Sequence, residues 1–228
     1  MSAPHPLDNP IWEALGASLA RFAESAGPAR RFVPDVSLLA GFNGPFQAAF
    51  DSFASLVGAG ESVGLFLKEP TPAAKGWTIS YETPLLQMLH RGGAVSGRAT
   101  DFLELGAADV PEMIALARLT KPGPFSERTR ELGDYVGLRE RGKLIAMSGE
   151  RLRVPGFTEI SAVCTHPDFL GRGYARALMA VIAQRILDRG EVPFLHVRAD
   201  NGRAAEFYER FGFSKRVLFH YAIFRRDA

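Results

Sequence analysis

The sequence has few of the residues that stabilise small secreted or metal-binding proteins. It contains one cysteine, Cys164, among 228 residues. One thiol cannot form a disulfide within the chain, so a disulfide framework is excluded and a reducing compartment is expected. The histidines lie far apart and lack the spacing of metal ligands, as the positions of His90, His166, His196 and His220 show. We therefore expect no metal site.

Signals for membranes and for export are also absent. No stretch approaches about 18 uninterrupted apolar residues, so a helix that spans a membrane is not expected. Residues 1–10, MSAPHPLDNP, lack the basic and then apolar pattern of a secretory signal peptide. These absences predict a cytoplasmic protein.

Charge of one sign is not in large excess. The formal net charge of +2 is too small to indicate nucleic-acid binding through bulk electrostatics, although it is compatible with an anionic cofactor. Hydrophobic residues make up 46% of the chain and charged residues 23%, a composition that supports a packed core. We expect a globular protein, monomeric or homodimeric, with no nucleic-acid or membrane partner.

The segment 91–100, RGGAVSGRAT, is the best candidate for a domain boundary, because it holds three glycines and no apolar side chain larger than Val95. We place a linker at 92–98, an N-terminal accessory module at 1–91 and a second module at 99–228. In the first module the patterns predict helices from Pro10 and from near Pro45, and strands at 62–68 and 77–81. No catalytic spacing appears there, so a scaffold is the simplest interpretation. The similarity of residues 62–65 to 135–138 leaves open a degenerate duplicate of the second module.

The second module alternates between strands and helices. Strands are predicted at 102–105, 135–139, 144–154, 157–165, 192–198 and 213–224, with helices at 109–119 and 172–189 and after Asn201. Short turns make the strands between 135 and 165 antiparallel. The long helix between the strands at 157–165 and 192–198 makes those two parallel. The expected fold is α/β, a mixed sheet covered by helices, with a smaller N-terminal α/β module.

A glycine turn, residues 171–175, follows a predicted strand and begins the long helix. Its two glycines remove the Cβ atoms that would keep a ligand away from the backbone. The free N–H groups of the first helical turn can bind phosphate oxygens, and Arg172 and Arg176 could add charge-assisted contacts. A dinucleotide fingerprint is disfavoured because Arg176 replaces its third glycine, and the Gly-Lys-Ser or Gly-Lys-Thr of a nucleotide triphosphatase is absent.

Chain lengths bring a second polar segment to the level of this turn. The helix 172–189 runs roughly 27 Å in one direction at about 1.5 Å per residue. The strand 192–198 returns roughly 23 Å at about 3.3 Å per residue. Asn201 therefore lies near the glycine turn, where it can cap a further helix.

These two motifs, in this order and spacing, resemble the core of the GNAT superfamily of acyl-CoA-dependent N-acyltransferases. The superfamily's turn is Gln or Arg, two residues, Gly, any residue, then Gly or Ala, and here it reads Leu170-Gly171-Arg172-Gly173-Tyr174-Ala175. The departure is Leu170. Residues 201–208, NGRAAEFY, followed by Phe211-Gly212-Phe213, are similar to the other hallmark. The resemblance covers about 99–228, and the N-terminal module suggests the two-part relatives that include glycine N-acyltransferases.

The resemblance implies a mixed, mostly antiparallel sheet that is splayed at a central parallel pair, with acetyl-CoA as the acyl donor and no metal. The pantetheine arm would lie in the gap between the parallel strands, and the pyrophosphate at the glycine turn. The implied cofactor-binding residues are Val163, Cys164, Thr165, Gly171, Arg172, Gly173, Tyr174, Ala175, Arg176, Asn201 and Ala204. By the same resemblance, the connection that carries Phe125 would form a wall of the acceptor site.

Two residues are candidates for proton transfer to and from the reacting groups. Tyr208 matches the family's general acid, which protonates the leaving CoA thiolate. Glu159 lies fourteen residues before Gly173, the spacing of the glutamate base in one branch of the family. It has the same strand parity as Ser161 and Val163, so we expect all three side chains on one face and Glu159 toward the cleft, unless a bulge intervenes. A water could serve as the base instead.

Other readings stay open. Cys164 has the opposite strand parity from Glu159 and Val163 and has no base placed for it, so a small buried hydrophobe is expected rather than a covalent nucleophile. His166 is a candidate secondary proton carrier. The expected activity is acetyl transfer to a primary amine of a small molecule or peptide. A non-catalytic acyl-CoA-binding module and an enzyme that uses a longer acyl-CoA are the alternatives.

Overall fold

The computed structural model describes residues 5–93, 95 and 101–228. The N-terminal half contains, in chain order, α1 (Pro10–Gly16), β1 (Ala23–Ala26), β2 (Ala29–Phe32), β3 (Leu39–Phe42), α2 (Phe46–Leu56), β4 (Ser62–Leu67) and β5 (Trp77–His90). Both helices and the strands β4 and β5 were predicted from the sequence, although β5 is nine residues longer than expected. The three short strands β1, β2 and β3 were not predicted.

The C-terminal half follows the predicted order of elements closely. It contains β6 (Leu103–Glu104), α3 (Val110–Thr120), β7 (Tyr135–Glu140), β8 (Lys143–Val154), β9 (Phe157–Thr165), α4 (Tyr174–Asp188), β10 (Val192–Arg198), α5 (Gly202–Phe211) and β11 (Phe213–Arg226). A short 3₁₀ helix, η4 (Thr129–Leu132), precedes β7, and another, η1 (Pro6–Asp8), precedes α1.

The eleven strands found in the described residues form one sheet in the order β1-β2-β3-β4-β11-β5-β10-β9-β8-β7-β6. Two neighbouring pairs are parallel, β3 with β4 and β9 with β10. The other neighbours are antiparallel. The predicted fold class, a mixed and mostly antiparallel sheet flanked by helices, is therefore confirmed.

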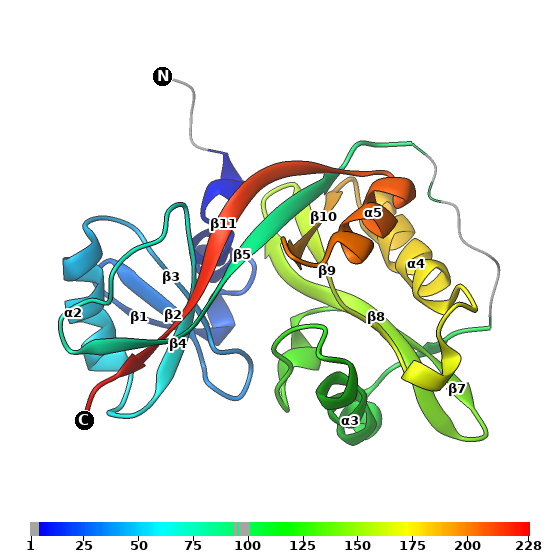
Figure 1. Ribbon diagram of the computed structural model, residues 1–228, viewed down its shortest axis with the longest axis horizontal. Helices are drawn as coiled ribbons and strands as arrows, with labels where there is room; N and C mark the ends of the chain where they lie inside the picture. The colour runs from blue at the N-terminus through cyan, green and yellow to red at the C-terminus, as the bar shows by residue number, and fades with distance from the viewer. Residues whose placement is uncertain (1–4, 94, 96–100) are drawn as a thin grey trace.

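The long strands β5 and β11 lie side by side across the middle of the molecule and join its two halves (Figure 1). Strand β5 precedes the predicted linker, yet it pairs with β10, which follows the linker. Strand β11 is the last in the chain, yet it pairs with β4 of the N-terminal half. Each half thus receives a strand from the other. Most of the predicted linker 92–98 lies outside the described residues, and the division into modules stays a prediction.

The two halves repeat one topology on either side of this central pair. In the N-terminal half, β2 and β3 are antiparallel, and α2 then crosses to β4, which is parallel to β3. In the C-terminal half, β8, β9, α4 and β10 have the same arrangement. This internal repeat agrees with a degenerate duplication. The short sequence similarity at 62–65 does not follow it, because β4 corresponds to β10 and not to β7.

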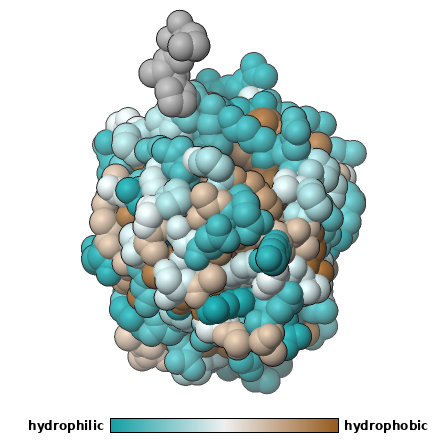
Figure 2. Space-filling model, turned by 90° about the vertical axis from the view of Figure 1, so that its left-hand side faces the viewer, coloured by the Kyte–Doolittle hydropathy of each residue, from teal (hydrophilic) through white to brown (hydrophobic). Residues whose placement is uncertain are grey.

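Each crossover helix buries one apolar stripe against the sheet. Leu178, Ile182 and Ile186 of α4 are fully buried at the expected helical spacing. In α2, Phe50 packs on Phe224 of β11, with ring centroids 4.7 Å apart. The outer surface on the side of α2 is mostly hydrophilic, with smaller apolar areas between polar residues (Figure 2). The apolar side chains thus lie mainly in the interior.

Candidate functional site

The parallel strands β9 and β10 separate part of the way along their length. They pair at three positions, from Phe157 with Val192 to Glu159 with Phe194. Beyond these positions β9 continues to Thr165 and β10 to Arg198, and within these described strands no further pairing joins them. This is the splayed parallel pair that the family resemblance implied. Backbone groups of β9 beyond Glu159 therefore border a gap in the sheet on the side of β10.

The glycine turn lies at the end of this gap, before α4. Gly171 and Gly173 have φ angles of +78° and +80°, a conformation that L side chains rarely adopt. A Cβ atom added at either glycine would meet no atom within 4 Å, so the space beside the turn is open. Gly173 is the N-cap of α4, and no side chain caps its first turn. The turn can therefore accept an anion at its backbone amides.

Two arginines of the turn flank this space. Arg172 is exposed, lies 3.7 Å from the Glu140 carboxylate, and stacks over the Phe169 ring at 4.9 Å. Arg176 is half-buried and lies over the Phe211 ring at 5.2 Å. Both positive charges are near the start of α4, where they add to the attraction of its N-terminus for an anion.

Helix α5 begins next to the same region. Asn201 is its N-cap, and its Oδ1 atom accepts a hydrogen bond from the backbone N–H of Ala204 at 3.1 Å. The capping role predicted from the sequence is confirmed. Ala204 is half-buried and packs against the core under α4. These residues follow β10, one strand of the splayed pair, and their contact with pantetheine stays a prediction.

Tyr208 of α5 lies on the apolar side of that helix. Its ring packs near Phe207 and Phe213, with centroid separations of 5.4 and 6.3 Å. Burial raises the pKa of its hydroxyl to about 12, and the nearby Cys164 adds to the increase. Because Cys164 on β9 contributes to this pKa, the Tyr208 hydroxyl lies near the splayed strand. At neutral pH this hydroxyl carries its proton.

Cys164 is buried, as the sequence predicts for a small hydrophobe. Burial raises the pKa of its thiol to about 11, although hydrogen bonds with Thr120 and with the backbone of Met147 lower it by smaller amounts. A protonated, buried thiol is a poor nucleophile. His166 caps a short 3₁₀ helix at the end of β9, where its Nδ1 accepts from the N–H of Asp168 at 3.3 Å.

A β-bulge in β9 changes which residues share a face. Ser161 pairs with Gly149 and Cys164 with Met147, so β9 has one residue more than β8 in this interval. Ala162 in the bulge has a φ angle of +53°. The expectation that Glu159 shares a face with Val163 is therefore wrong. Val163 packs in the core under α4, whereas Cys164 belongs to the cluster under α3 and lies on the face of Glu159.

Glu159 is held by two buried partners. Arg151 donates from Nε to Oε2 at 2.8 Å and from Nη2 to Oε1 at 2.7 Å. The Nδ1 atom of His196 lies 2.7 Å from Oε1. Burial alone would raise the pKa of Glu159, but the charge of Arg151 and the hydrogen bonds outweigh it and hold the pKa at about 2. The carboxylate is thus ionised and has a low affinity for protons.

The protonation of His196 follows from its second neighbour, Gln87. The Oε1 atom of Gln87 accepts from Arg216 at 2.8 Å, so its amide nitrogen faces His196 Nε2 at 3.1 Å. Nε2 must then accept, and Nδ1 donates to Glu159. Burial lowers the pKa of His196, in agreement with a neutral ring. Arg151 and His196 were not predicted to belong to the site. In the sequence each is only a polar residue within a strand whose neighbouring residues are buried.

The predicted acceptor wall lies on the same face as Glu159. The Phe125 ring packs edge-on against the Tyr135 ring at 5.7 Å, within the cluster under α3. The hydroxyl of Tyr135 in this cluster and the hydroxyl of Tyr221 on β11 are buried and have no hydrogen-bond partner among the described residues. Both tyrosines interact electrostatically with Arg151. Buried hydroxyls without a partner are rare, which marks this face as a place where a polar group of a substrate or a water can bind.

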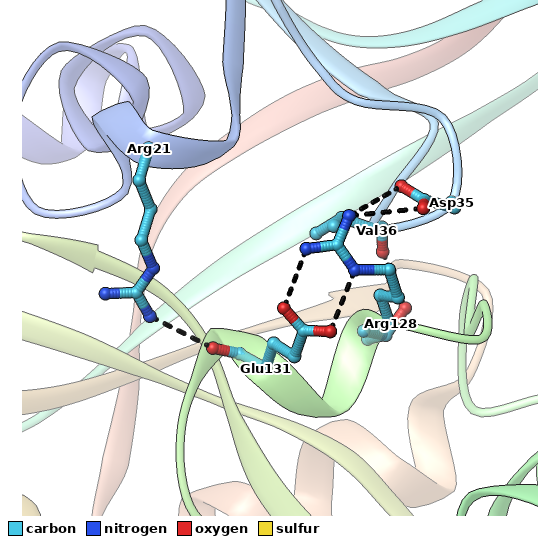
Figure 3. A network of polar contacts seen from close by, with 6 residues as sticks. Arg21, Asp35, Val36, Arg128 and Glu131 are labelled. Carbon is cyan, nitrogen blue, oxygen red and sulfur yellow. Dashed lines mark hydrogen bonds and ion pairs between the residues drawn. The ribbon is translucent and has the colours of Figure 1, made fainter. Parts of the chain in front are cut away.

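A polar network fixes the connection behind Phe125 to the N-terminal half (Figure 3). Arg128 forms an ion pair with Asp35 at 3.2 Å and with Glu131 at 2.8 Å. The Thr129 hydroxyl donates to the carbonyl of Val36 at 2.7 Å, and Arg21 donates to the carbonyl of Glu131 at 3.4 Å. The N-terminal half therefore holds in place the connection that carries Phe125, the predicted acceptor wall.

Metal sites and membrane-spanning helices were also sought among the described residues. Within the described ranges no group of three or more His, Cys, Asp or Glu side chains could hold a metal ion. Among the same residues no helix is long and apolar enough to cross a membrane.

Comparisons with known proteins agree with this geometry. Residues 135–222 match the family of FR47-like proteins. A solved structure from Novosphingobium aromaticivorans, assigned to the GNAT family, is 36% identical, covers 99% of this chain and 100% of that one, and has a TM-score of 0.92. A GCN5-related N-acetyltransferase from Kribbella flavida shares the fold at 19% identity, with a TM-score of 0.62 over 92% of each chain.

Curated relatives match over shorter segments. The N-alpha-acetyltransferase RimI of Mycobacterium tuberculosis is 37% identical over 103 residues, which are 41% of this chain and 63% of RimI. Mycothiol acetyltransferase of Corynebacterium aurimucosum is 39% identical over 61 residues, 26% of this chain and 20% of that protein. The matched segments thus span less than two thirds of either relative. The full-length match to the N. aromaticivorans structure, together with the splayed strands and the glycine turn, shows that the chain belongs to the GNAT family.

Proposed function

We propose that this protein transfers an acetyl group from acetyl-CoA to the primary amine of a small molecule or peptide. The observation that carries the proposal is the gap between β9 and β10, with an open glycine turn at its end. The turn would hold the pyrophosphate through the backbone amides of residues 171–176, with Arg172 and Arg176 adding positive charge. The pantetheine arm would lie along Val163, Cys164 and Thr165, with Asn201 and Ala204 opposite.

The chemistry follows from direct attack. The neutral amine forms a C–N bond to the thioester carbonyl carbon, the C–S bond breaks, and the CoA thiolate takes a proton. Tyr208 is the proposed donor of that proton, because a hydroxyl with a pKa of about 12 carries its proton at neutral pH and can hydrogen-bond to the sulfur as negative charge develops on it. Backbone N–H groups near Val163 would polarise the carbonyl, and holding the two substrates together would supply much of the rate.

Glu159 stays the proposed base, and its surroundings limit how it acts. A carboxylate with a pKa of about 2 takes a proton only weakly, so a water between Glu159 and the amine suits the site better than direct transfer. An α-amine, with a pKa of about 7.7, is partly neutral near pH 7 and needs little help, whereas a lysine-like amine with a pKa of about 10.4 needs much. The similarity to a protein named N-alpha-acetyltransferase also supports an α-amine acceptor.

Release of free thiol from acetyl-CoA in the presence of a panel of amines tests the activity. The panel includes amino acids, short peptides with free N-termini and polyamines. Tyr208→Phe is expected to lower kcat at least about tenfold if the hydroxyl donates the proton, with the affinity for acetyl-CoA retained. Wild-type turnover in this variant would refute the assignment of Tyr208.

The same assay separates the alternatives. Binding of acetyl-CoA without thiol release from any amine would favour a non-catalytic binding module. Faster release from longer acyl-CoA donors would favour a different acyl chain. The cytoplasm stays the proposed location, and a monomer or homodimer the proposed assembly.

A further inference from the structure

A cavity lies in the N-terminal half, and Phe66 in its wall packs on the ring of His196, the partner of Glu159, at 4.6 Å. The volume of the cavity is about 770 Å³. This volume lies within the range of small-molecule sites. Residues of three segments line it, from within 5–13 around η1 and α1, 40–46 at the end of β3 and the start of α2, and 65–71 at the end of β4.

The internal repeat of the fold relates this cavity to the splayed strands of the C-terminal half. Strands β3 and β4 are parallel and pair at only two positions, Leu39 with Gly64 and Ala40 with Leu65, before each continues. They correspond to β9 and β10, and α2 corresponds to α4. The cavity therefore lies at the carboxyl ends of the parallel strands β3 and β4. The corresponding place in the C-terminal half is the gap between β9 and β10, next to the N-terminus of α4. Ligands of open α/β sheets bind at such places.

This cavity does not have the chemistry of a coenzyme A site. The turn before α2 reads Asn43-Gly44-Pro45, with Pro45 at the N-cap, and 39–46 contain no lysine or arginine. Proline has no N–H to offer a phosphate. Helix α1 also packs closely on β3 here, since a Cβ atom on Gly41 would lie 2.6 Å from the backbone nitrogen of Trp12. The space along β3 is thus occupied by protein.

The charges around the cavity favour a cation. Asp8 is neutralised, because it contacts Arg216 and lies 4.0 Å from Lys68. Glu13 and Glu69 also line the cavity, and no ion pair within the described ranges involves either carboxylate. Two negative charges are therefore left without a partner of opposite sign. The remaining walls are largely apolar and include the aromatic side chains Trp12, Phe42, Phe46 and Phe66.

We propose that this cavity of the N-terminal half binds a small organic amine, in its ammonium form and with an aromatic or aliphatic body. The ammonium group lies against Glu13 and Glu69, and the body packs among the aromatic walls. Such a ligand belongs to the same chemical class as the proposed acceptor. The site itself does not depend on the catalytic activity of the C-terminal half.

Tryptophan emission provides a direct test, because Trp12 lines the cavity and Trp77 is buried elsewhere. Titration of the full chain with 2-phenylethylamine is expected to change the emission in a saturable way, and Trp12→Phe should abolish the change. Glu13→Gln and Glu69→Gln should each weaken binding about two- to fivefold, the usual effect of one partly exposed ion pair. Glu82→Gln, an exposed glutamate outside the cavity, is the matched control and should bind like the wild type.

A second probe, of opposite charge, completes the test. 3-Phenylpropionate has a similar body and a negative charge, so it should not change the emission. An equal response to the two probes, an absence of response to the amine at millimolar concentration, or unchanged affinity in both glutamine variants would each overturn the proposal. These outcomes are independent of thiol release from acetyl-CoA, so the failure of this proposal is distinguishable from the failure of the catalytic one.

Discussion

The Glu159 carboxylate lies between two buried partners, Arg151 and His196, in the middle of an eleven-stranded sheet. Its spacing from Gly173 was visible in the sequence, and so was its place on a strand. Its partners were not, because they come from β8 and β10, and the bulge at Ala162 depends on how β9 pairs with β8. Local alternation could not show that the face of the strand changes between Glu159 and Val163.

Removal of the negative charge of Glu159 should destabilise the protein. In Glu159→Gln the buried Arg151 loses its ionic partner, and breaking a buried ion pair costs about 3–5 kcal/mol. The free energy of unfolding in urea at pH 7 is the measurement. Arg151→Met combined with Glu159→Gln should recover a large part of the loss, because no buried charge then lacks a partner. A single variant as stable as the wild type would contradict the ion pair.

The same pair predicts a dependence of stability on pH. The folded pKa of Glu159 is about 2, below the usual value of 4.5, so the folded state binds fewer protons than the unfolded state between these values. The stability that Glu159 contributes is complete above about pH 4.5 and is lost as the pH falls toward 2. Unfolding curves of wild type and Glu159→Gln from pH 7 to pH 3 should therefore converge. A difference that stays constant over this range would argue against the lowered pKa.

At the level of elements, the strand-turn-helix-strand-helix unit from β9 to α5 could be predicted almost completely. Its turns are short, its glycines are placed where positive φ angles are needed, and α4 has a clear apolar stripe. The strands β1 and β2 have four residues each and no apolar alternation, so nothing local marked them. Strand β5 was expected to end at Tyr81, yet it runs through Pro84 to His90 between β11 and β10.

The glycine turn gives a prediction at this level. Gly173→Ala adds a Cβ atom at a φ angle of +80°, which costs about 1–2 kcal/mol in the free protein. If the turn holds a pyrophosphate, the same atom also obstructs the ligand, and the Kd for CoA should rise at least about tenfold. Gly190→Ala is the matched control, because Gly190 at the other end of α4 has a φ of +74° and equally open surroundings. Thermal unfolding should show similar losses for both variants, and calorimetric titration should show weaker CoA binding for Gly173→Ala alone.

At the level of the whole molecule, the exchange of β5 and β11 makes each half incomplete without the other. The sequence indicated two modules but could not show that their strands are exchanged, since pairings such as that of β11 with β4 join residues about 160 positions apart. The N-terminal half also contacts the connection that carries Phe125, the predicted acceptor wall. The contact is made by the loop around Asp35 and the short helix η4 (Figure 3).

This contact predicts that a residue outside the cleft affects acceptor binding. Arg128 is exposed, so its replacement by alanine should change global stability little. It nevertheless joins Asp35 to Glu131 and so fixes the connection that carries Phe125. In Arg128→Ala, amide hydrogen exchange in residues 122–132 should become faster while exchange in β8 and β9 stays unchanged. Arg185→Ala, which removes the ion pair with Glu104 on β6, is the control and should leave the exchange of residues 122–132 unaffected.

Once an acceptor amine is identified, its KM should rise in Arg128→Ala while the KM for acetyl-CoA does not. Unchanged exchange in 122–132 would show that the hydrogen bonds of Thr129 hold the connection without the help of Arg128.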